Sequence, residues 1–162
     1  MSIFLKTEDE IELMREANLL VGKTLAEVGR HVKPGVTTLQ LDKIAEEFIR
    51  DNGAIPTFKG YPSSYGPPFP GSICASVNDV VVHGVPSEDV VLKDGDIISV
   101  DCGTLLNGFN GDSCYTFCVG EVSEDVKKLL RTTKESLYKG IEVAQAGHHV
   151  GAVSYTHLTL PT

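Results

Sequence analysis

Apolar residues recur every three or four positions in two stretches near the start of the chain. The first stretch predicts a helix that begins after Thr7 with a capping box and runs to about Gly29. The second predicts a helix that begins at Thr37 or Thr38 and stops near Gly53, because glycine readily adopts the left-handed backbone of a helix end. The N-terminal part of the chain is therefore expected to be helical.

The apolar pattern changes further along the chain. Residues 72–77, 97–102 and 109–119 are rich in apolar and β-branched residues, which predicts three strands. Asn107-Gly108 is a strong signal for a tight hairpin between the last two strands. A further helix is expected from about Ser123 to Ala144. This order of elements predicts an α+β fold class.

Two segments between these elements carry candidate binding groups. Residues 57–71 are rich in Gly, Pro, Ser and Tyr and are not expected to form regular structure. Long loops in compact domains often line binding sites, and this one holds Tyr61, Tyr65 and Phe69. Residues 80–86 form an apolar segment in which His83 is expected at a strand end, before a turn at Gly84.

Asp101 and Asp112 are the strongest candidates for chemistry. If the Asn-Gly pair forms the hairpin loop, Asp101 faces Cys114 on the neighbouring strand. Asp112 lies two residues before Cys114 and therefore points to the same face of the sheet. The two backbones are then diagonal neighbours about 7–8 Å apart. A bulge or a wider loop would place the aspartates directly opposite each other instead.

Two carboxylates that converge between apolar strands repel each other and lose hydration. A cation between them removes this penalty, so the pair indicates half of a metal site. A surface hairpin with two solvated aspartates is the alternative. The segment lacks the alternating acidic positions and terminal Glu of an EF-hand, which excludes that class of calcium site.

His83 precedes the carboxylate pair within the β-rich part of the chain. It could donate a hydrogen bond to a substrate or to a developing charge, and a structural hydrogen bond is the alternative. The cysteines form no Cys-x-x-Cys pair, so no structural zinc site is expected. We expect reduced, mostly buried thiols. The four cysteines are Cys74, Cys102, Cys114 and Cys118.

Composition narrows the classes of function. The chain has 162 residues, a net charge of −8 and no run of Lys or Arg, which argues against direct nucleic-acid binding. No apolar run approaches the roughly 18 residues that a membrane span needs, and the N-terminus has no signal-peptide core. A cytoplasmic protein without membrane attachment is therefore expected.

Segments spread over most of the chain share their sequence and spacing with a known family. They are residues 7–15, 32–42, 72–78, 82–86, 92–101 and 108–112. Together they resemble the type I methionine aminopeptidases, which have the pita-bread fold. The resemblance runs from about Thr7 to about Gly151. It implies that residues 1–152 form the N-terminal half of a pita-bread domain, with helices packed on one face of a curved antiparallel sheet.

The resemblance also implies roles for individual residues. Asp101 and Asp112 match the two aspartates that bind the metals in that family. His83 matches the histidine that contacts substrate and stabilises the reacting centre, and Cys74 matches a position near the pocket for the methionine side chain. The implied reaction is hydrolytic removal of the N-terminal methionine from peptides and nascent chains, favoured by a small second residue. The implied cofactors are two divalent ions, with Mn, Fe, Co and Zn all admissible.

The family uses five metal ligands, and the resemblance places one His and two Glu of that set in the C-terminal half of the fold. We therefore expect this chain to be a truncated and inactive fragment of an enzyme that is a monomer when full length and is associated with the ribosome in function. Residues 153–162 carry no charged residue and no helical period. We expect them to be a non-native tail, and a genuine C-terminal strand is the alternative.

Other classes of function remain open at this point. Prolidases and aminopeptidases P share the fold, but they carry a large domain before it, and the 100 residues that precede Asp101 leave no room for one. A non-catalytic pita-bread homologue that binds partners typically lacks metal ligands, whereas both aspartates and His83 are present here. An unrelated α+β binding module is the third alternative.

Overall fold

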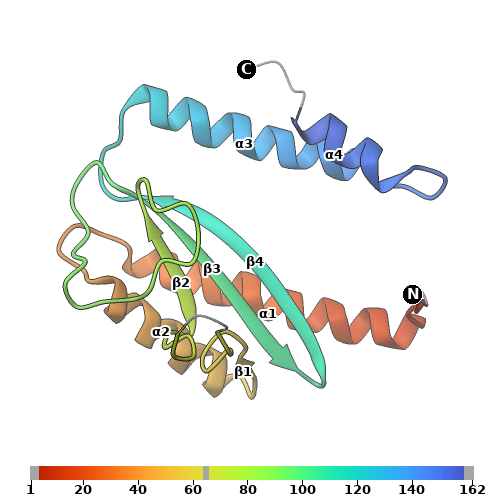
Figure 1. Ribbon diagram of the computed structural model, residues 1–162, viewed down its shortest axis with the longest axis horizontal. Helices are drawn as coiled ribbons and strands as arrows, with labels where there is room; N and C mark the ends of the chain where they lie inside the picture. Colours follow the sequence, from red (N-terminus) through yellow and green to blue (C-terminus); the bar gives the residue numbers. More distant parts are fainter. Residues whose placement is uncertain (1–3, 64–65, 159–162) are drawn as a thin grey trace. The chain divides into compact units, whose positions relative to one another are not determined.

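The computed structural model describes residues 4–63 and 66–158. The chain divides into two compact units, residues 1–121 and 122–162. The first unit holds two helices and a four-stranded antiparallel sheet, and the second holds two further helices (Figure 1). In order, the elements are α1 (Glu8–His31), α2 (Thr38–Asp51), β1 (Ile55–Pro56), β2 (Ile73–Val77), β3 (Ile97–Leu106), β4 (Phe109–Cys118), α3 (Glu124–Glu142) and α4 (Val150–Leu158).

Both N-terminal helices begin where the sequence predicts. The Glu10 backbone N–H donates to Thr7 Oγ1 at 3.3 Å, and the Thr7 N–H donates to Glu10 Oε2 at 2.8 Å, which completes the predicted capping box of α1. Thr37 caps α2 with the same arrangement. Helix α2 ends just before Gly53, whose φ of +74° is the left-handed conformation expected at a helix end.

The sheet is organised around β3. This strand pairs with β1 and β2 along one edge and with β4 along the other. The predicted hairpin is confirmed, because Leu106 pairs with Phe109 across a loop made of Asn107 and Gly108. Both loop residues have positive φ values, 52° and 82°, as the favoured two-residue hairpin turn requires. Strand β3 is four residues longer than predicted, because its distal part also pairs with β1.

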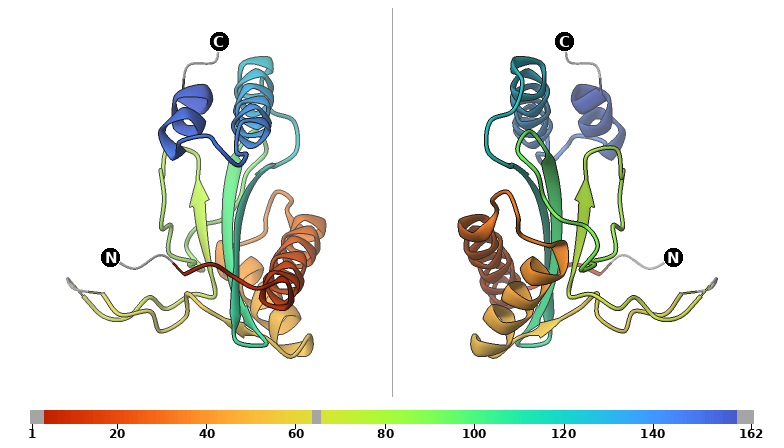
Figure 2. Two further views of the ribbon diagram at one scale, coloured as in Figure 1. Left: turned by 90° about the vertical axis from the view of Figure 1, so that its right-hand side faces the viewer. Right: turned by 90° about the vertical axis from the view of Figure 1, so that its left-hand side faces the viewer.

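Helices α1 and α2 cover one face of the sheet, as predicted (Figure 2). Helix α1 lies on β3 and β4, and α2 contacts α1, β1 and β2. The core between the layers is apolar, and each large side chain fully buried there contributes about 1.5–3 kcal/mol to folding. Its fully buried members include Val21, Val28, Leu41, Ile49, Ile73, Leu92, Ile98 and Val100. The packing leaves the other face of the sheet free to carry a site.

Residues 80–86 do not form a strand. They form a loop in which Val81 and Val82 are 86% and 62% exposed, and His83 has a φ of +59°. The expectation that His83 sits at a strand end is therefore wrong. The Ala75 N–H donates to the Gly84 carbonyl at 2.8 Å, but the left-handed backbone at His83 turns the chain away before a ladder can form.

The prediction of buried cysteines is confirmed for Cys74 and Cys102 and is wrong for Cys114 and Cys118, which are exposed. Strand β4 pairs only with β3 among the described residues, and helices cover one of its two faces. The apolar side chains around the aspartates were also expected to be buried. This expectation is confirmed for β3, whereas Tyr115 on β4 is 51% exposed.

The second unit contains the helix predicted from Ser123. The Val126 N–H donates to Ser123 Oγ at 3.3 Å and caps α3. Helix α4 (Val150–Leu158) includes residues 153–158, where the sequence shows no helical period, so the strand alternative is wrong for these residues. Helix propensities of ordinary residues differ by less than about 1 kcal/mol, which is too little for β-branched residues to prevent a helix. The non-native origin of residues 153–162 stays a prediction, and residues 159–162 lie outside the described part.

None of the helices within residues 4–63 and 66–158 combines the length and the apolar character needed to cross a membrane.

Candidate metal centre and adjoining pocket

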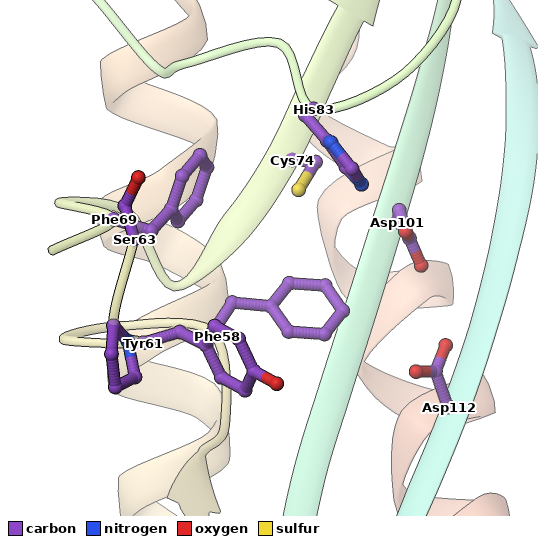
Figure 3. Close-up of a pocket in the computed structure, with 9 residues that line it drawn as sticks. Phe58, Tyr61, Ser63, Phe69, Cys74, His83, Asp101 and Asp112 are labelled. Carbon is purple, nitrogen blue, oxygen red and sulfur yellow. The ribbon is translucent and has the colours of Figure 1, made fainter. Parts of the chain in front are cut away.

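Asp101 and Asp112 lie on one face of the β3–β4 hairpin, as strand parity predicts. Asp101 is in register with Cys114, and Asp112 is in register with Gly103, so the two aspartates are diagonal neighbours. Their carboxylates point toward each other across the two strands (Figure 3). The alternative of directly opposed aspartates is excluded by this register.

The electrostatics of the pair favour a bound cation. Asp101 is half-buried, whereas Asp112 is exposed. Burial raises the pKa of the Asp101 carboxyl above its usual value, and the Asp112 carboxylate raises this pKa further, while His83 lowers it. Desolvation of Asp101 argues against a pair of fully solvated surface aspartates. A cation between the two carboxylates would stabilise both in their ionised form.

Helix α1 holds the strand that carries Asp112. The Asp112 N–H donates to Asn18 Oδ1 at 3.2 Å. One residue earlier, a Cβ on Gly111 would lie 2.5 Å from the Ala17 carbonyl oxygen, so only glycine permits this approach of helix and strand. The Thr104 hydroxyl donates to the same carbonyl at 3.2 Å. The helix backbone therefore fixes the position of β4 beside the carboxylates.

His83 reaches the site from the loop between β2 and β3. Its imidazole is directed toward Asp101 (Figure 3). Strand β2 holds the loop, because the Gly84 N–H donates to Ser76 Oγ at 3.1 Å next to the Ala75–Gly84 hydrogen bond. A Cβ on Gly84 would lie 2.6 Å from the Ala75 carbonyl carbon, so the loop approaches β2 more closely than a side chain allows.

Cys74 lies beside Asp101 on the neighbouring strand. Cys74, Asp101 and Cys114 are in register and form a row across β2, β3 and β4. Burial, reinforced by the two aspartates, raises the pKa of the Cys74 thiol to about 11. This thiol is therefore neutral near pH 7, and Cys74 acts as an uncharged part of the wall.

A pocket of about 590 Å³ adjoins the carboxylates. It brings together all four residues singled out from the sequence and two of the three aromatic residues predicted on the long loop, Tyr61 and Phe69; Tyr65 lies outside the described residues. Its lining comprises Phe58, Tyr61, Pro62, Ser63, Phe69, Cys74, His83, Asp101 and Asp112.

Phe58, Pro62 and Ser63 were not singled out from the sequence. The sequence feature that could have indicated them is their position in the same Gly- and Pro-rich loop. Phe58 reaches the site because β3 has no side chain at Gly103, where a Cβ would lie 2.8 Å from Phe58 Cε1. Gly103 is also the register partner of Asp112, which places the Phe58 ring close to the carboxylates.

The carboxylates supply part of a metal coordination sphere. Within residues 4–63 and 66–158, no three His, Cys, Asp or Glu side chains are arranged to hold a metal ion together. Carboxylate oxygens suit divalent ions such as Mn²⁺, and a pair that repels in the absence of a cation fits a dinuclear or mononuclear divalent site. The two aspartates therefore fit the role of metal ligands.

Comparison with known proteins identifies a family. The model of "Metallopeptidase family M24" matches residues 12–159. A methionine aminopeptidase of Clostridium acetobutylicum is 50% identical over 154 residues, which cover 95% of this chain and 60% of that protein. The crystal structure of methionine aminopeptidase from Rickettsia prowazekii has a TM-score of 0.90 and 39% identity, over 96% of this chain and 60% of the other.

A more distant structure shares the fold alone. The Xaa-Pro dipeptidase from Bacillus anthracis has a TM-score of 0.79 at 24% identity. These neighbours confirm the predicted pita-bread α+β fold class. The chain spans about 60% of the length of the methionine aminopeptidases that it matches. The family match extends over both aspartates, the histidine and nearly all of the described residues, and on this ground the chain belongs to metallopeptidase family M24.

Proposed function

We propose that the protein is a methionine aminopeptidase, which hydrolyses the peptide bond after an N-terminal methionine and works best when the second residue is small. The observation that carries this proposal is that Asp101, Asp112 and His83 line the same aromatic pocket. The match to family M24 and the 50% identity to a relative with this activity in its name support it.

The pocket suits the side chain of methionine. Its wall is mainly aromatic and apolar, from Phe58, Tyr61, Pro62 and Phe69, with the neutral Cys74 thiol beside them. A thioether is flexible and polarisable, and contacts between its sulfur and aromatic rings contribute about 0.3–1.5 kcal/mol each. This lining supports the proposed substrate-binding roles of Cys74 and the aromatic residues.

Asp101 and Asp112 are the residues of this chain that would hold divalent ions. Mn, Fe, Co and Zn are all compatible with oxygen-rich ligation. Ions bound there supply Lewis acidity, which lowers the pKa of a water molecule and polarises a carbonyl group. We propose two ions, as the resemblance to the type I enzymes implies. The chain's own contribution is to bring the two carboxylates together at one end of the side-chain pocket.

His83 is the proposed catalytic residue. Its imidazole faces Asp101 from the opposite side of the pocket to Asp112 (Figure 3). An imidazole in this place can donate a hydrogen bond to the carbonyl oxygen of the scissile bond as negative charge develops there. The hydrogen bonds that β2 makes to Gly84 hold the ring in position.

The proposed substrates are peptides and nascent chains with an N-terminal methionine. Nascent chains emerge from ribosomes in the cytoplasm, so we place the protein there, acting close to the ribosome and as a monomer. The net charge of −8 argues against direct binding of RNA.

We propose that the 162 residues alone are inactive, because the resemblance places three further metal ligands in the C-terminal half of the fold. A peptide assay therefore tests the function on the full-length protein, meaning this chain continued by that C-terminal half. The purified protein, stripped of metal and supplied with Mn²⁺ or Co²⁺, should release methionine from Met-Ala-Ser and release it at least about 10-fold more slowly from Met-Glu-Ser. Asp112→Asn should abolish release, whereas the exposed Asp51→Asn should not. Absence of methionine release, or faster cleavage of Xaa-Pro peptides than of Met-Ala-Ser, would contradict the proposal.

A further inference from the structure

Residues 57–72, here called the pocket loop, connect β1 to β2 and carry most of the aromatic wall. The loop has hydrogen bonds of its own: the Gly60 N–H donates to the Phe69 carbonyl at 2.8 Å, and the Phe69 N–H donates to the Tyr61 carbonyl at 2.9 Å. These bonds hold its two arms together. At the start of the loop, the Thr57 N–H also donates to the Gly103 carbonyl on β3 at 3.1 Å. The side chains that hold the rest of the loop come from α2.

The end of the pocket loop that leads into β2 is held by Asp42 on α2. This side chain is 4% exposed, and its Oδ1 accepts hydrogen bonds from the Ser72 N–H at 2.6 Å and the Ile73 N–H at 3.0 Å. Cys74 follows immediately. Just before, a Cβ on Gly71 would lie 2.8 Å from Pro86, which belongs to the His83 loop. Asp42 therefore acts where the aromatic wall, the thiol and the histidine loop converge.

The start of the pocket loop, at Lys59, is held by Glu46. This residue lies one helical turn after Asp42 on α2. Its carboxylate accepts from Lys59 Nζ at 2.5 Å and from Arg50 Nε at 2.9 Å. Lys59 is adjacent to Phe58, the ring that lies on Gly103. The Glu46 side chain is 20% exposed and the Lys59 side chain is 42% exposed, so this is a partly solvated ion pair whose effect is expected to be modest.

Asp42 and Glu46 are four residues apart and share one face of α2. We propose that they are positioning residues that clamp the two ends of the pocket loop to α2, and that the selectivity of the pocket for the first side chain depends on this clamp. The choice of methionine as the recognised side chain rests on the proposed function. Neither carboxylate lines the pocket, so each acts through the residues it holds.

Single substitutions on α2 separate the clamp from general effects on the helix. In the full-length protein with Mn²⁺, Glu46→Gln should raise KM for Met-Ala-Ser about 3-fold, and Asp42→Asn about 10-fold, with little change in kcat. Discrimination between Met-Ala-Ser and Leu-Ala-Ser should fall by similar factors. Glu47→Gln makes the same chemical change at an exposed position of the same helix and should leave both quantities unchanged.

A double-mutant cycle tests the ion pair. If Glu46 and Lys59 act as a unit, Glu46→Gln combined with Lys59→Gln should be no worse than either single variant. If the increases in KM of the two single variants multiply in the double variant, the clamp between Glu46 and Lys59 is contradicted. This pair keeps the test decisive even if Asp42→Asn fails to fold.

Hydrogen exchange gives a readout that does not need turnover. Amides in residues 57–63 and 66–73 should exchange faster in Glu46→Gln and Asp42→Asn than in the wild type, and Glu47→Gln should match the wild type. A wild-type protein that releases no methionine overturns the proposed function, and exchange then decides the clamp alone. Unchanged exchange, or unchanged selectivity in an active protein, overturns the clamp.

Discussion

The Asp101 and Asp112 carboxylates face each other diagonally across one β-hairpin, with Asp101 half-buried and Asp112 exposed. The protein thus builds a local excess of negative charge on the face of the sheet that α1 and α2 leave uncovered. The two negative charges therefore lower the stability of the metal-free protein, and the same charges raise its affinity for metal ions.

Asp101→Asn should separate these two properties. Removing one charge relieves the repulsion, so the Tm of the metal-free protein should rise by about 1–3 °C. Affinity for Mn²⁺ should fall by about 100-fold or more, because half of the described carboxylate ligands are lost. Calorimetry in EDTA and titration with Mn²⁺ measure the two effects, and Asp51→Asn is the control. A lower Tm for metal-free Asp101→Asn would contradict the repulsion described here.

Gly84→Ala should displace His83. The new methyl group would lie 2.6 Å from the Ala75 carbonyl carbon, so the loop must leave β2 and break its hydrogen bonds. In the full-length protein, we expect kcat for Met-Ala-Ser to fall at least about 10-fold. Gly22→Ala is the matched control, since nothing lies within 4 Å of its added methyl group and the change should stabilise α1 by up to about 1 kcal/mol. Equal kcat values for the two variants would contradict this account.

Gly103→Ala should affect binding more than chemistry. Its methyl group would clash with Thr57 Oγ1 and would lie 2.8 Å from Phe58 Cε1, so both side chains must move and the Phe58 ring would leave the pocket wall. KM for Met-Ala-Ser should rise about 10-fold while affinity for Mn²⁺ changes little. Steady-state kinetics and metal titration distinguish the outcomes. A large loss of metal affinity would mean that the methyl group disturbs β3 itself.

Asp96 should make stability depend on pH. A hydrogen bond from the Asn78 side chain, at 2.8 Å, and one from the Lys93 N–H, at 2.8 Å, lower the pKa of its carboxyl. The ionised form is therefore favoured in the folded state. Its contribution is present above the pKa of the unfolded chain and is lost as pH falls through the folded value.

Asp96→Asn is the corresponding variant. It should lower the free energy of unfolding by about 1 kcal/mol at pH 7 and by clearly less near pH 3. Urea titrations of the metal-free protein at the two pH values measure the difference, with Asp79→Asn as an exposed control. The same loss at both pH values would show that the carboxylate charge is not what matters.

The sequence was sufficient to predict features that depend on local pattern. The Thr7 capping box, the Asn107-Gly108 turn and the shared face of Asp101 and Asp112 follow from spacing and parity, and all three are confirmed. These features need no knowledge of which distant segments touch. The roles of the candidate site residues stay proposals.

Features that depend on distant contacts could not be predicted in the same way. The backbone of His83 is set by a hydrogen bond to β2, and the exposure of Cys114 is set by which side of β4 the helices cover. Phe58 enters the pocket only because Gly103, on another strand, has no side chain. The hydrophobic periodicity of a sequence does not indicate which distant residues contact each other. Helix α4 was missed for a different reason, since its residues have weak preferences.

The hairpin that carries the carboxylates also has consequences for folding. Its turn joins Leu106 to Phe109 through two residues, whereas the contact between Thr104 and Ala17 spans 87 positions. Short loops close much faster than long ones, so the hairpin is expected to form before α1 covers it. The two negative charges then meet early and oppose their own folding step. Refolding from urea should accordingly proceed faster in Mn²⁺ than in EDTA.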